Sequence, residues 1–233
     1  MSWPNCGFET TKTHNSLCAG CWLDIRFITH PLCDRLGIPL PFDPGGGPIL
    51  SAAALAKETD FERTRVVAHY SGVMRKLIHL FKYADQHAPA QLFTAWIEHA
   101  ASELISDATV IVPVPLHYTR LLSRRFNQSA IIARRLAVRT DRPVVVDALV
   151  RRRKTASQVG LTRDQRRRNL RGAFAVRDSG VPGIKDQNVL LIDDVITTGT
   201  TVEACARSLK RCGARRIDVA ALALVSDEAR INL

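Results

Sequence analysis

The chain has 233 residues, and its 46% hydrophobic content is enough for a folded core, which excludes a wholly disordered protein. No apolar run approaches the roughly 18 residues that a membrane-spanning helix needs, and the amino terminus lacks a signal-peptide pattern, so we expect a soluble cytoplasmic protein. The net charge of +11 is concentrated in residues 118–142 and 151–171, which favours a polyanionic partner, either nucleic acid or a phosphate-rich small molecule, over an ordinary solvated basic surface.

The amino-terminal part differs in composition from the remainder of the chain. Residues 1–36 contain four of the six cysteines, and residues 37–48 are rich in Pro and Gly, as linkers are. We therefore predict a small cysteine-rich lobe with its linker over residues 1–48 and a larger domain over residues 49–233. Apolar residues at helical spacing predict helices over residues 74–84 and 89–104.

From residue 109 onward, predicted strands alternate with predicted helices. This alternation is typical of an α/β fold with a mostly parallel sheet flanked by helices. The expected strands are 109–115, 143–150, 172–176, 188–195 and 216–224, and the expected helices are 123–140 and 201–212.

The strongest functional signal is the segment VLLIDDVITTGTT, residues 189–201. Ligands of open parallel sheets bind beyond the carboxyl ends of the strands, which is where Asp193 and Asp194 are expected. Carboxylates accept hydrogen bonds from sugar hydroxyls. The following loop opens onto a helix, whose first N–H groups and dipole favour an anion, and Gly199 permits close backbone approach. The segment therefore predicts a site for a diol together with a phosphate.

Other interpretations of this segment have less support. An apolar strand that ends in two acids also occurs as a Walker B strand, but the chain has no Gly-Lys dipeptide and hence no Walker A loop. It has no G-x-G-x-x-G dinucleotide motif either. The remaining alternative is an ordinary strand–turn–helix unit with a threonine at the helix start.

The same thirteen residues resemble the phosphoribosyl pyrophosphate (PRPP) motif of type I phosphoribosyltransferases. By this resemblance, Asp193 and Asp194 are the catalytic pair that binds the ribose hydroxyls. The 5-phosphate would be held by the loop residues Thr197, Thr198, Gly199, Thr200 and Thr201.

Further segments resemble the ComF family, including its GntX-type members. They are YSGVMRKLIHLFKY (70–83), VPVPLHYTRLLSRRFNQSAIIARRLA (112–137) and RRKTASQVGLTRDQRRRNLRGAFAV (152–176). The resemblance extends from about Leu17 to Val225 in the same order. It implies a type I phosphoribosyltransferase-like domain behind a zinc-ribbon-like lobe, with a link to competence and DNA uptake.

The family resemblance also implies groups that contact pyrophosphate. Residues 113–117 stand where type I enzymes bind pyrophosphate, and residues 151–171 match a mobile loop that closes over PRPP, where a cationic lid suits a charged substrate. The candidates are Lys82, Pro115, Leu116, His117, Arg120, Arg124, Arg125, Gln158, Arg166 and Asn169. One departure is Arg125, where the family commonly has glycine, and it puts close ligand approach at that turn in doubt.

The lobe departs further from the family, whose members typically carry three Cys-x-x-Cys pairs. Only Cys18 and Cys21 form an intact pair here. Because one tetrahedral Zn²⁺ takes four ligands, Cys6, Cys18, Cys21 and Cys33 are candidate metal ligands, with His14 and His30 as spare candidates. The alternative is a lobe that packs without metal. Cys205 and Cys212 are expected to fill the core.

Two functions remain open at this point. In the first, the domain binds PRPP with Mg²⁺ and transfers the phosphoribosyl group to an unidentified acceptor. In the second, the fold is a non-catalytic module that senses PRPP or a nucleotide, or handles single-stranded DNA or competence proteins, with the 151–171 segment on the phosphate backbone. Neither a general base nor an acceptor can be assigned from the sequence.

Overall fold

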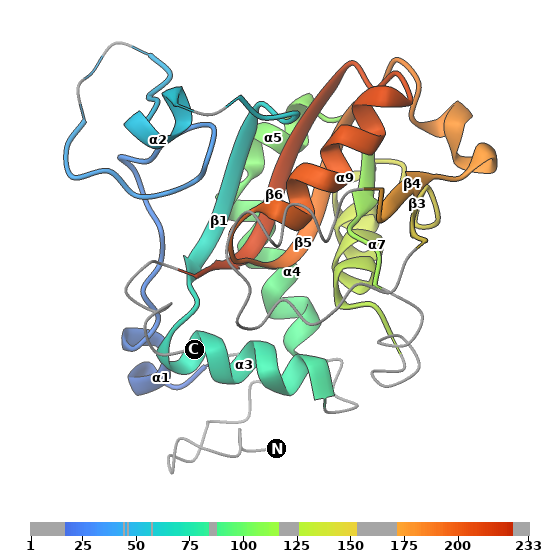
Figure 1. Cartoon of the computed structure of the whole chain (residues 1–233). Helices are drawn as coiled ribbons and strands as arrows, with labels where there is room; N and C mark the ends of the chain where they lie inside the picture. Colours follow the sequence, from blue (N-terminus) through green and yellow to red (C-terminus); the bar gives the residue numbers. More distant parts are fainter. Residues whose placement is uncertain are drawn as a thin grey trace.

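A four-stranded parallel sheet forms the centre of the computed structural model, which describes residues 17–43, 45, 47–56, 58–83, 88–116, 126–152 and 172–225. The strand order is β1-β6-β5-β2. The strands are β1 (Arg63–His69), β2 (Val110–Pro113), β5 (Asn188–Ile196) and β6 (Arg216–Leu224). Figure 1 shows β5 and β6 at the middle of the sheet, where both faces are covered.

The apolar side chains of the strands pack into two separate hydrophobic cores, one on each face of the sheet. Successive side chains of a strand point to opposite faces. In β5, Val189 and Leu191 belong to the core under α9, whereas Leu190 and Ile192 belong to the core under the other helices. This is why β5 carries no polar residue between Asn188 and Asp193.

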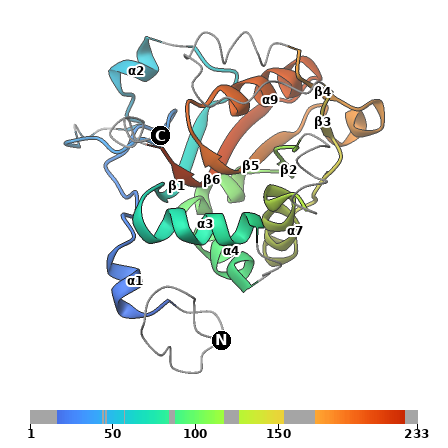
Figure 2. The same ribbon diagram turned by 60° about the horizontal axis from the view of Figure 1, so that its bottom comes forward.

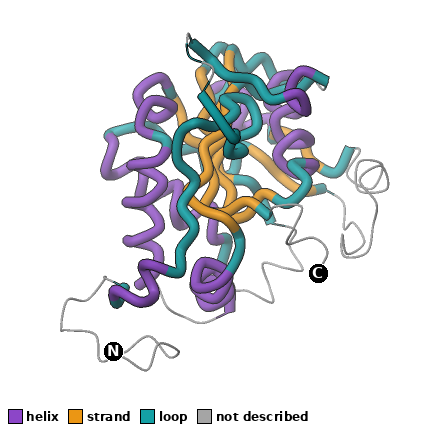
Figure 3. Tube along the Cα trace, turned by 90° about the vertical axis from the view of Figure 1, so that its left-hand side faces the viewer, coloured by secondary structure: helices purple, strands orange, loops and turns teal. Residues whose placement is uncertain are grey.

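Helices cover both faces of the sheet. One face carries α3 (Gly72–Tyr83), α4 (Ala88–Ala100), α5 (Ser102–Asp107) and α7 (Gln128–Thr140), and the other carries α9 (Thr200–Arg211). Figure 2 shows the sheet between α9 and the group of α3, α4 and α7, and Figure 3 shows the same layers from the side. The prediction of a parallel sheet flanked by helices is thus confirmed.

Two of the expected strands do not join this sheet. From residues 143–150, only an isolated parallel bridge between Val144 and Ile111 reaches β2. Instead, β3 (Leu149–Arg151) pairs with β4 (Phe174–Val176) in a separate antiparallel pair, followed by a 3₁₀ helix (Asp178–Gly183). The sequence predicted strands in both places but not that they pair with each other, because short apolar runs do not reveal the partner with which a strand pairs.

The remaining differences lie in the amino-terminal half of the domain. The expected helix over 89–104 is two helices, α4 and α5, which meet at Ala101. Strand β1 was not predicted, although five of its seven residues are buried. Two of those five, Thr64 and Arg65, are polar and obscure the apolar pattern. Among the described residues, no helix is both long and apolar enough to cross a bilayer.

The amino-terminal segment packs along the free edge of β1. It contains α1 (Ala19–Leu23) and α2 (Ala52–Leu55). Phe27 forms an antiparallel bridge with Ala68, and the Ile28 N–H donates to the Val67 carbonyl at 2.9 Å. These contacts cover backbone groups that an edge strand would otherwise expose. The proposed domain boundary at residue 48 stays a prediction.

Candidate functional site

Asp193 is buried in the carboxyl-terminal part of β5, three residues before the strand ends at Ile196, so the acidic pair lies within the strand and not beyond it. Asp193 is only 7% exposed, and its Oδ1 accepts a hydrogen bond from the Asp194 N–H at 2.8 Å. Burial, with a further contribution from the Asp194 charge, raises the pKa of Asp193 to about 8. At neutral pH the Asp193 carboxyl is therefore largely protonated and can both donate and accept a hydrogen bond.

Lys82 neutralises the second aspartate. Its Nζ lies 2.8 Å from Asp194 Oδ2, and the two side chains are 14% and 16% exposed. Lys82 comes from the last turn of α3, which crosses near the carboxyl ends of the strands (Figure 1). The structure thus brings together two predicted site residues that are 112 positions apart in the sequence.

The start of α7 completes the surroundings of the acidic pair. The Ser129 hydroxyl lies 3.5 Å from Asp193 Oδ1 and lowers its pKa in opposition to burial. Asn127 caps α7 by accepting the Ser129 N–H, and its amide donates to the Val114 carbonyl at 3.0 Å. Asn127 therefore ties the helix start to the end of β2.

Gln128 connects α7 to α3 from inside the protein. This residue is 1% exposed, and its Nε2 donates to the carbonyls of Phe81 and Lys82 at 3.4 Å. It holds the end of α3 and hence the backbone of Lys82. The sequence analysis placed residues 112–137 among the segments that resemble the ComF family but gave no role to Ser129. The available signal was the position of Ser129 at the start of a helix that follows a sheet strand.

The loop from Thr197 to Thr201 forms the second half of the site. All five residues are partly exposed. Gly199 has φ +72° and stands at the N-cap of α9, and no side chain of the described residues caps this helix. The helix starts where the sequence predicted it, and its use as an anion site stays a prediction. Thr198 and Thr200 share a hydrogen bond of 2.6 Å between their hydroxyls.

The end of β2 lies beside the end of β5. Pro113 is in register with Ile192, and the Val114 N–H donates to the Ile192 carbonyl at 2.9 Å. Pro115 and Leu116 follow directly and are partly exposed. The proposed pyrophosphate turn therefore begins next to the acidic pair. The other candidates, His117, Arg120, Arg124, Arg125, Gln158, Arg166 and Asn169, lie outside the described residues.

The described cysteines do not form a metal site. No three His, Cys, Asp or Glu side chains gather as a metal site requires anywhere in the described ranges. Cys18 and Cys21 lie together at the start of α1, where the Cys21 N–H donates to Cys18 Sγ. Cys33 is fully buried, and its sulfur accepts the Ser51 N–H at 3.3 Å. Cys6 lies outside the described residues, so the set of four ligands stays a prediction.

The two carboxyl-terminal cysteines behave as apolar residues. Cys205 is fully buried in the core under α9, and burial raises its pKa well above the ordinary thiol value. Cys212 is partly exposed and packs against the same core. These contacts agree with the expectation that both residues fill the core.

The carboxyl groups, the lysine and the helix start each suit a different chemical group of a ligand. The buried Asp193, the partly exposed Asp194, Lys82 and a helix start with a glycine N-cap lie at one edge of the sheet. The carboxyls suit hydroxyl groups, the helix start suits a phosphate, and the lysine suits a second anionic group. A ligand that carries a diol between two phosphate groups satisfies all three.

Two domain models and a solved structure are similar to parts of this chain. A phosphoribosyl transferase domain model matches residues 122–230, and a double zinc ribbon domain model matches residues 4–53. A solved purine phosphoribosyltransferase from Pyrococcus horikoshii is similar with a TM-score of 0.37 and 23% identity, over 57% of this chain and 75% of that one.

Curated relatives are similar over nearly the whole chain. Competence protein F of Haemophilus influenzae is 30% identical over 224 residues, which is 90% of both chains. DNA utilization protein YhgH of Escherichia coli K12 is 29% identical over 92% of both chains. Competence protein ComFC of Bacillus subtilis is 24% identical over 87% of this chain and 81% of the relative. The chain belongs to the ComF family of competence proteins, with a phosphoribosyltransferase-type domain and an amino-terminal double zinc ribbon domain.

Proposed function

We propose that the site binds PRPP with Mg²⁺ and transfers its phosphoribosyl group to an acceptor. The observation that carries the proposal is the buried Asp193 beside Asp194, which pairs with Lys82, next to the start of α9, where the N-cap Gly199 has no side chain. In this proposal the 5-phosphate occupies the loop from Thr197 to Thr201, and the ribose hydroxyls bind the two aspartates. The diphosphate then lies toward Lys82 and the end of β2.

In the proposed reaction, negative charge moves from the ribose carbon C1 to the leaving diphosphate. The bond between ribose C1 and the diphosphate oxygen breaks, and the electron pair leaves with pyrophosphate. A new bond forms between C1 and the acceptor atom, which loses a proton. Lys82 is placed to stabilise the leaving diphosphate, and the ionised Asp194 carboxylate stabilises the positive charge that develops on the ribose. Positioning and electrostatics thus supply the catalysis.

Mg²⁺ fits this site only together with the ligand. The described residues hold no cluster of three metal-binding side chains, and the one adjacent acidic pair is already engaged with Lys82. Mg²⁺ commonly uses one or two carboxylates and takes its other ligands from substrate phosphates and water. In our proposal the cation enters with the diphosphate, whose charge it compensates.

Calorimetric titration with PRPP and Mg²⁺ tests the proposal. The wild-type chain is expected to bind, whereas an Asp193→Asn/Asp194→Asn double variant is expected to lose most of the affinity. Ribose 5-phosphate provides a control ligand that has the diol and one phosphate but no leaving group. Absence of PRPP binding by the folded wild type would refute the proposal.

Pyrophosphate release separates catalysis from sensing. A nucleobase panel with an enzyme-coupled pyrophosphate assay is expected to reveal the acceptor. If PRPP binds but no acceptor or water yields pyrophosphate, the second interpretation, a non-catalytic PRPP or nucleotide sensor, replaces the first.

A further inference from the structure

Three consecutive residues at the start of α7 contact three different elements around the acidic pair. The Asn127 amide donates to the Val114 carbonyl at the end of β2, at 3.0 Å. The Gln128 amide donates to the last turn of α3, and the Ser129 hydroxyl lies 3.5 Å from Asp193 Oδ1 in β5. One short segment therefore fixes how α3, β2 and β5 meet.

Gln128 supplies hydrogen-bond donors at the carboxyl-terminal end of α3. Its Nε2 lies 3.4 Å from the carbonyl oxygens of both Phe81 and Lys82. These two residues belong to the last turn of α3, where carbonyls have no donor within the helix. Gln128 is 1% exposed, so water has little access to these bonds. The amide therefore ties the backbone of Lys82 to α7.

The amide oxygen of Gln128 does not explain why this residue is polar. Oε1 is buried and has no hydrogen-bond partner among the described residues. A buried acceptor without a partner lowers stability. Turning the amide over would place this oxygen against two carbonyl oxygens, so the contacts with α3 determine the orientation of the amide. What an apolar side chain of similar size could not supply is the donor at the end of α3.

The position of the Lys82 ammonium group depends on the position of its backbone. The side chain is a flexible four-carbon stem, and its Nζ lies 2.8 Å from Asp194 Oδ2. We infer that Gln128 is a positioning residue, which holds Lys82 beside Asp194 and thereby sets the affinity of the site for a diphosphate group. The inference rests on the function proposed above, because the diphosphate is the group that Lys82 contacts in that proposal.

Gln128 acts through Lys82 and not on the ligand itself. Its burial leaves almost no surface for a ligand. The loop proposed for the 5-phosphate leads into α9, which covers the opposite face of the sheet from α3 and α7. A change at Gln128 is therefore expected to affect the diphosphate end of PRPP and not the ribose 5-phosphate end.

The test replaces Gln128 by methionine, an unbranched side chain of similar length. Gln128→Met removes the donor and the unpaired oxygen together, so the two effects on stability oppose each other. Circular dichroism and thermal melting check the folding of the variant. Gln128→Leu is the second variant, used if the methionine chain does not fold.

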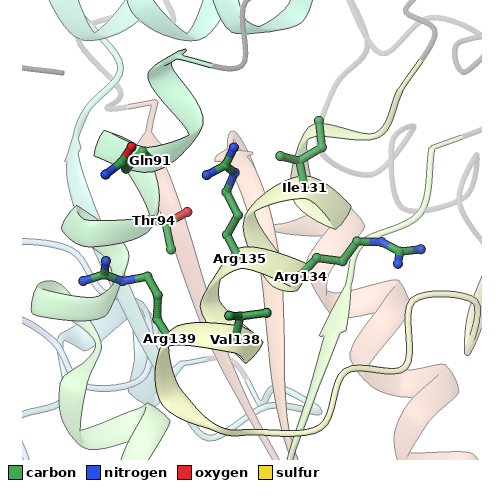
Figure 4. Close-up of a pocket in the computed structure, with 7 residues that line it drawn as sticks. All are labelled: Gln91, Thr94, Ile131, Arg134, Arg135, Val138 and Arg139. Carbon is green, nitrogen blue, oxygen red and sulfur yellow. The ribbon is translucent and has the colours of Figure 1, made fainter. Parts of the chain in front are cut away.

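Thr94→Val is the matched control. Thr94 is also buried, and its side chain also donates to a helix carbonyl, that of Ala90. It lies on α4, where it lines a groove together with Arg135 of α7 (Figure 4). Its hydroxyl bonds within its own helix and not to α3, so this variant removes a comparable buried hydrogen bond without releasing Lys82.

The first measurement is calorimetric titration with PRPP and Mg²⁺ and, separately, with ribose 5-phosphate. Gln128→Met is expected to weaken PRPP binding by about tenfold, within the range of coupling between residues of one network, and to leave ribose 5-phosphate binding unchanged. Lys82→Gln/Gln128→Met is expected to bind PRPP no more weakly than Lys82→Gln alone, because both changes remove the same interaction. Thr94→Val should bind both ligands as the wild type does.

The second measurement needs no PRPP. It follows the carboxyl carbon of Asp193 by NMR as the pH is varied in the ligand-free chain, with Asp193→Asn to assign the signal. Burial and the Asp194 charge raise the pKa of Asp193, whereas the Lys82 charge and the Ser129 hydroxyl lower it. Gln128→Met and Lys82→Gln should therefore both raise the pKa of Asp193 above its wild-type value, and Thr94→Val should leave it unchanged.

The two measurements separate failure of the inference from failure of the proposed function. A folded Gln128→Met chain with wild-type affinity for PRPP, or with an unchanged pKa of Asp193, would overturn the inference. Equal losses for both ligands would overturn it as a general disturbance of the site, and so would full additivity of Lys82→Gln and Gln128→Met. If the wild-type chain binds no PRPP, the proposed function fails, whereas the pKa of Asp193 still decides whether Gln128 positions Lys82.

Discussion

Lys82 and Asp194 form an ion pair of 2.8 Å that joins the end of α3 to the end of β5. In the free protein the lysine compensates an acidic pair that is mostly shielded from water. When an anionic ligand arrives, the same ammonium group lies near enough to turn toward it. The ion pair therefore stabilises the empty site and also provides a cation for the proposed diphosphate.

The first prediction concerns this lysine. We expect Lys82→Gln to weaken PRPP binding by about 10- to 100-fold, since a hydrogen bond to a charged group contributes about 1.5–3 kcal/mol. Binding of ribose 5-phosphate should change much less, because that ligand has no diphosphate. Calorimetry with both ligands measures the difference. Lys76→Gln, an exposed lysine on the same helix, is the control, and equal losses for both ligands would contradict the assigned role.

The second prediction concerns the pH dependence of stability. The pKa of Asp193 rises from 3.8 in its ordinary state to about 8 when buried. The folded state therefore holds this proton more strongly than the unfolded state, and its contribution is fully present below about pH 4 and is lost as the pH rises toward 8. Each pKa unit corresponds to about 1.4 kcal/mol. Urea unfolding of the wild type should show stability that decreases over this range.

Asp193→Asn provides the comparison for the pH prediction. The variant should have a flatter pH profile and should exceed the wild type in stability near pH 8. Asp218 also has a raised pKa, because burial outweighs its neighbouring arginines, so some pH dependence will remain. A variant profile as steep as the wild-type profile would show that Asp193 is not the titrating group.

The third prediction concerns the start of α9. Gly199 has φ +72° with no atom near the position of an added Cβ, so Gly199→Ala introduces backbone strain of about 1–2 kcal/mol without a clash. We expect a small loss of thermal stability together with weaker binding of ribose 5-phosphate. Gly45→Ala, with φ +73° and similar open space, tests for strain alone and should not affect the ligand.

The fourth prediction concerns attachment of the amino-terminal segment. Arg65 is 6% exposed, and its guanidinium lies 2.6 Å from Asp34 and also bonds Glu103. Arg65→Met should lower the free energy of unfolding by about 2–4 kcal/mol, because two acids lose their shared partner. Arg139→Gln, which breaks the exposed pair with Glu98, should cost less than about 1 kcal/mol in the same urea titration.

The fifth prediction concerns zinc. Cys18→Ser/Cys21→Ser should reduce the zinc content of the purified chain to background, because this pair has the spacing of metal ligands. Cys33→Ala should leave the zinc content nearly unchanged, since Cys33 is buried and bonded to the Ser51 backbone. Metal analysis of both variants decides whether Cys33 is a ligand, and loss of zinc in Cys33→Ala would support the four-cysteine set.

The central strands and the acidic residues of the candidate site could be predicted from the sequence. Strand β6 lies where alternation of apolar runs predicted it, and Asp193, Asp194 and Gly199 are adjacent in one strand–loop–helix unit. Local spacing specifies such units, because the residues that define them are close along the chain. The pairing of β3 with β4 is not of this kind, since it depends on contacts between distant segments.

Which distant residues surround the acidic pair could not be predicted from the sequence and is visible only in the folded structure. Lys82 reaches Asp194, Ser129 faces Asp193, and Gln128 holds the end of α3. The folded structure also decided that Asp193 is buried, and hence that its pKa lies near 8. The physical reason is that desolvation and ion pairing depend on the packing of three separate elements around one point, and no local pattern in the sequence encodes that packing.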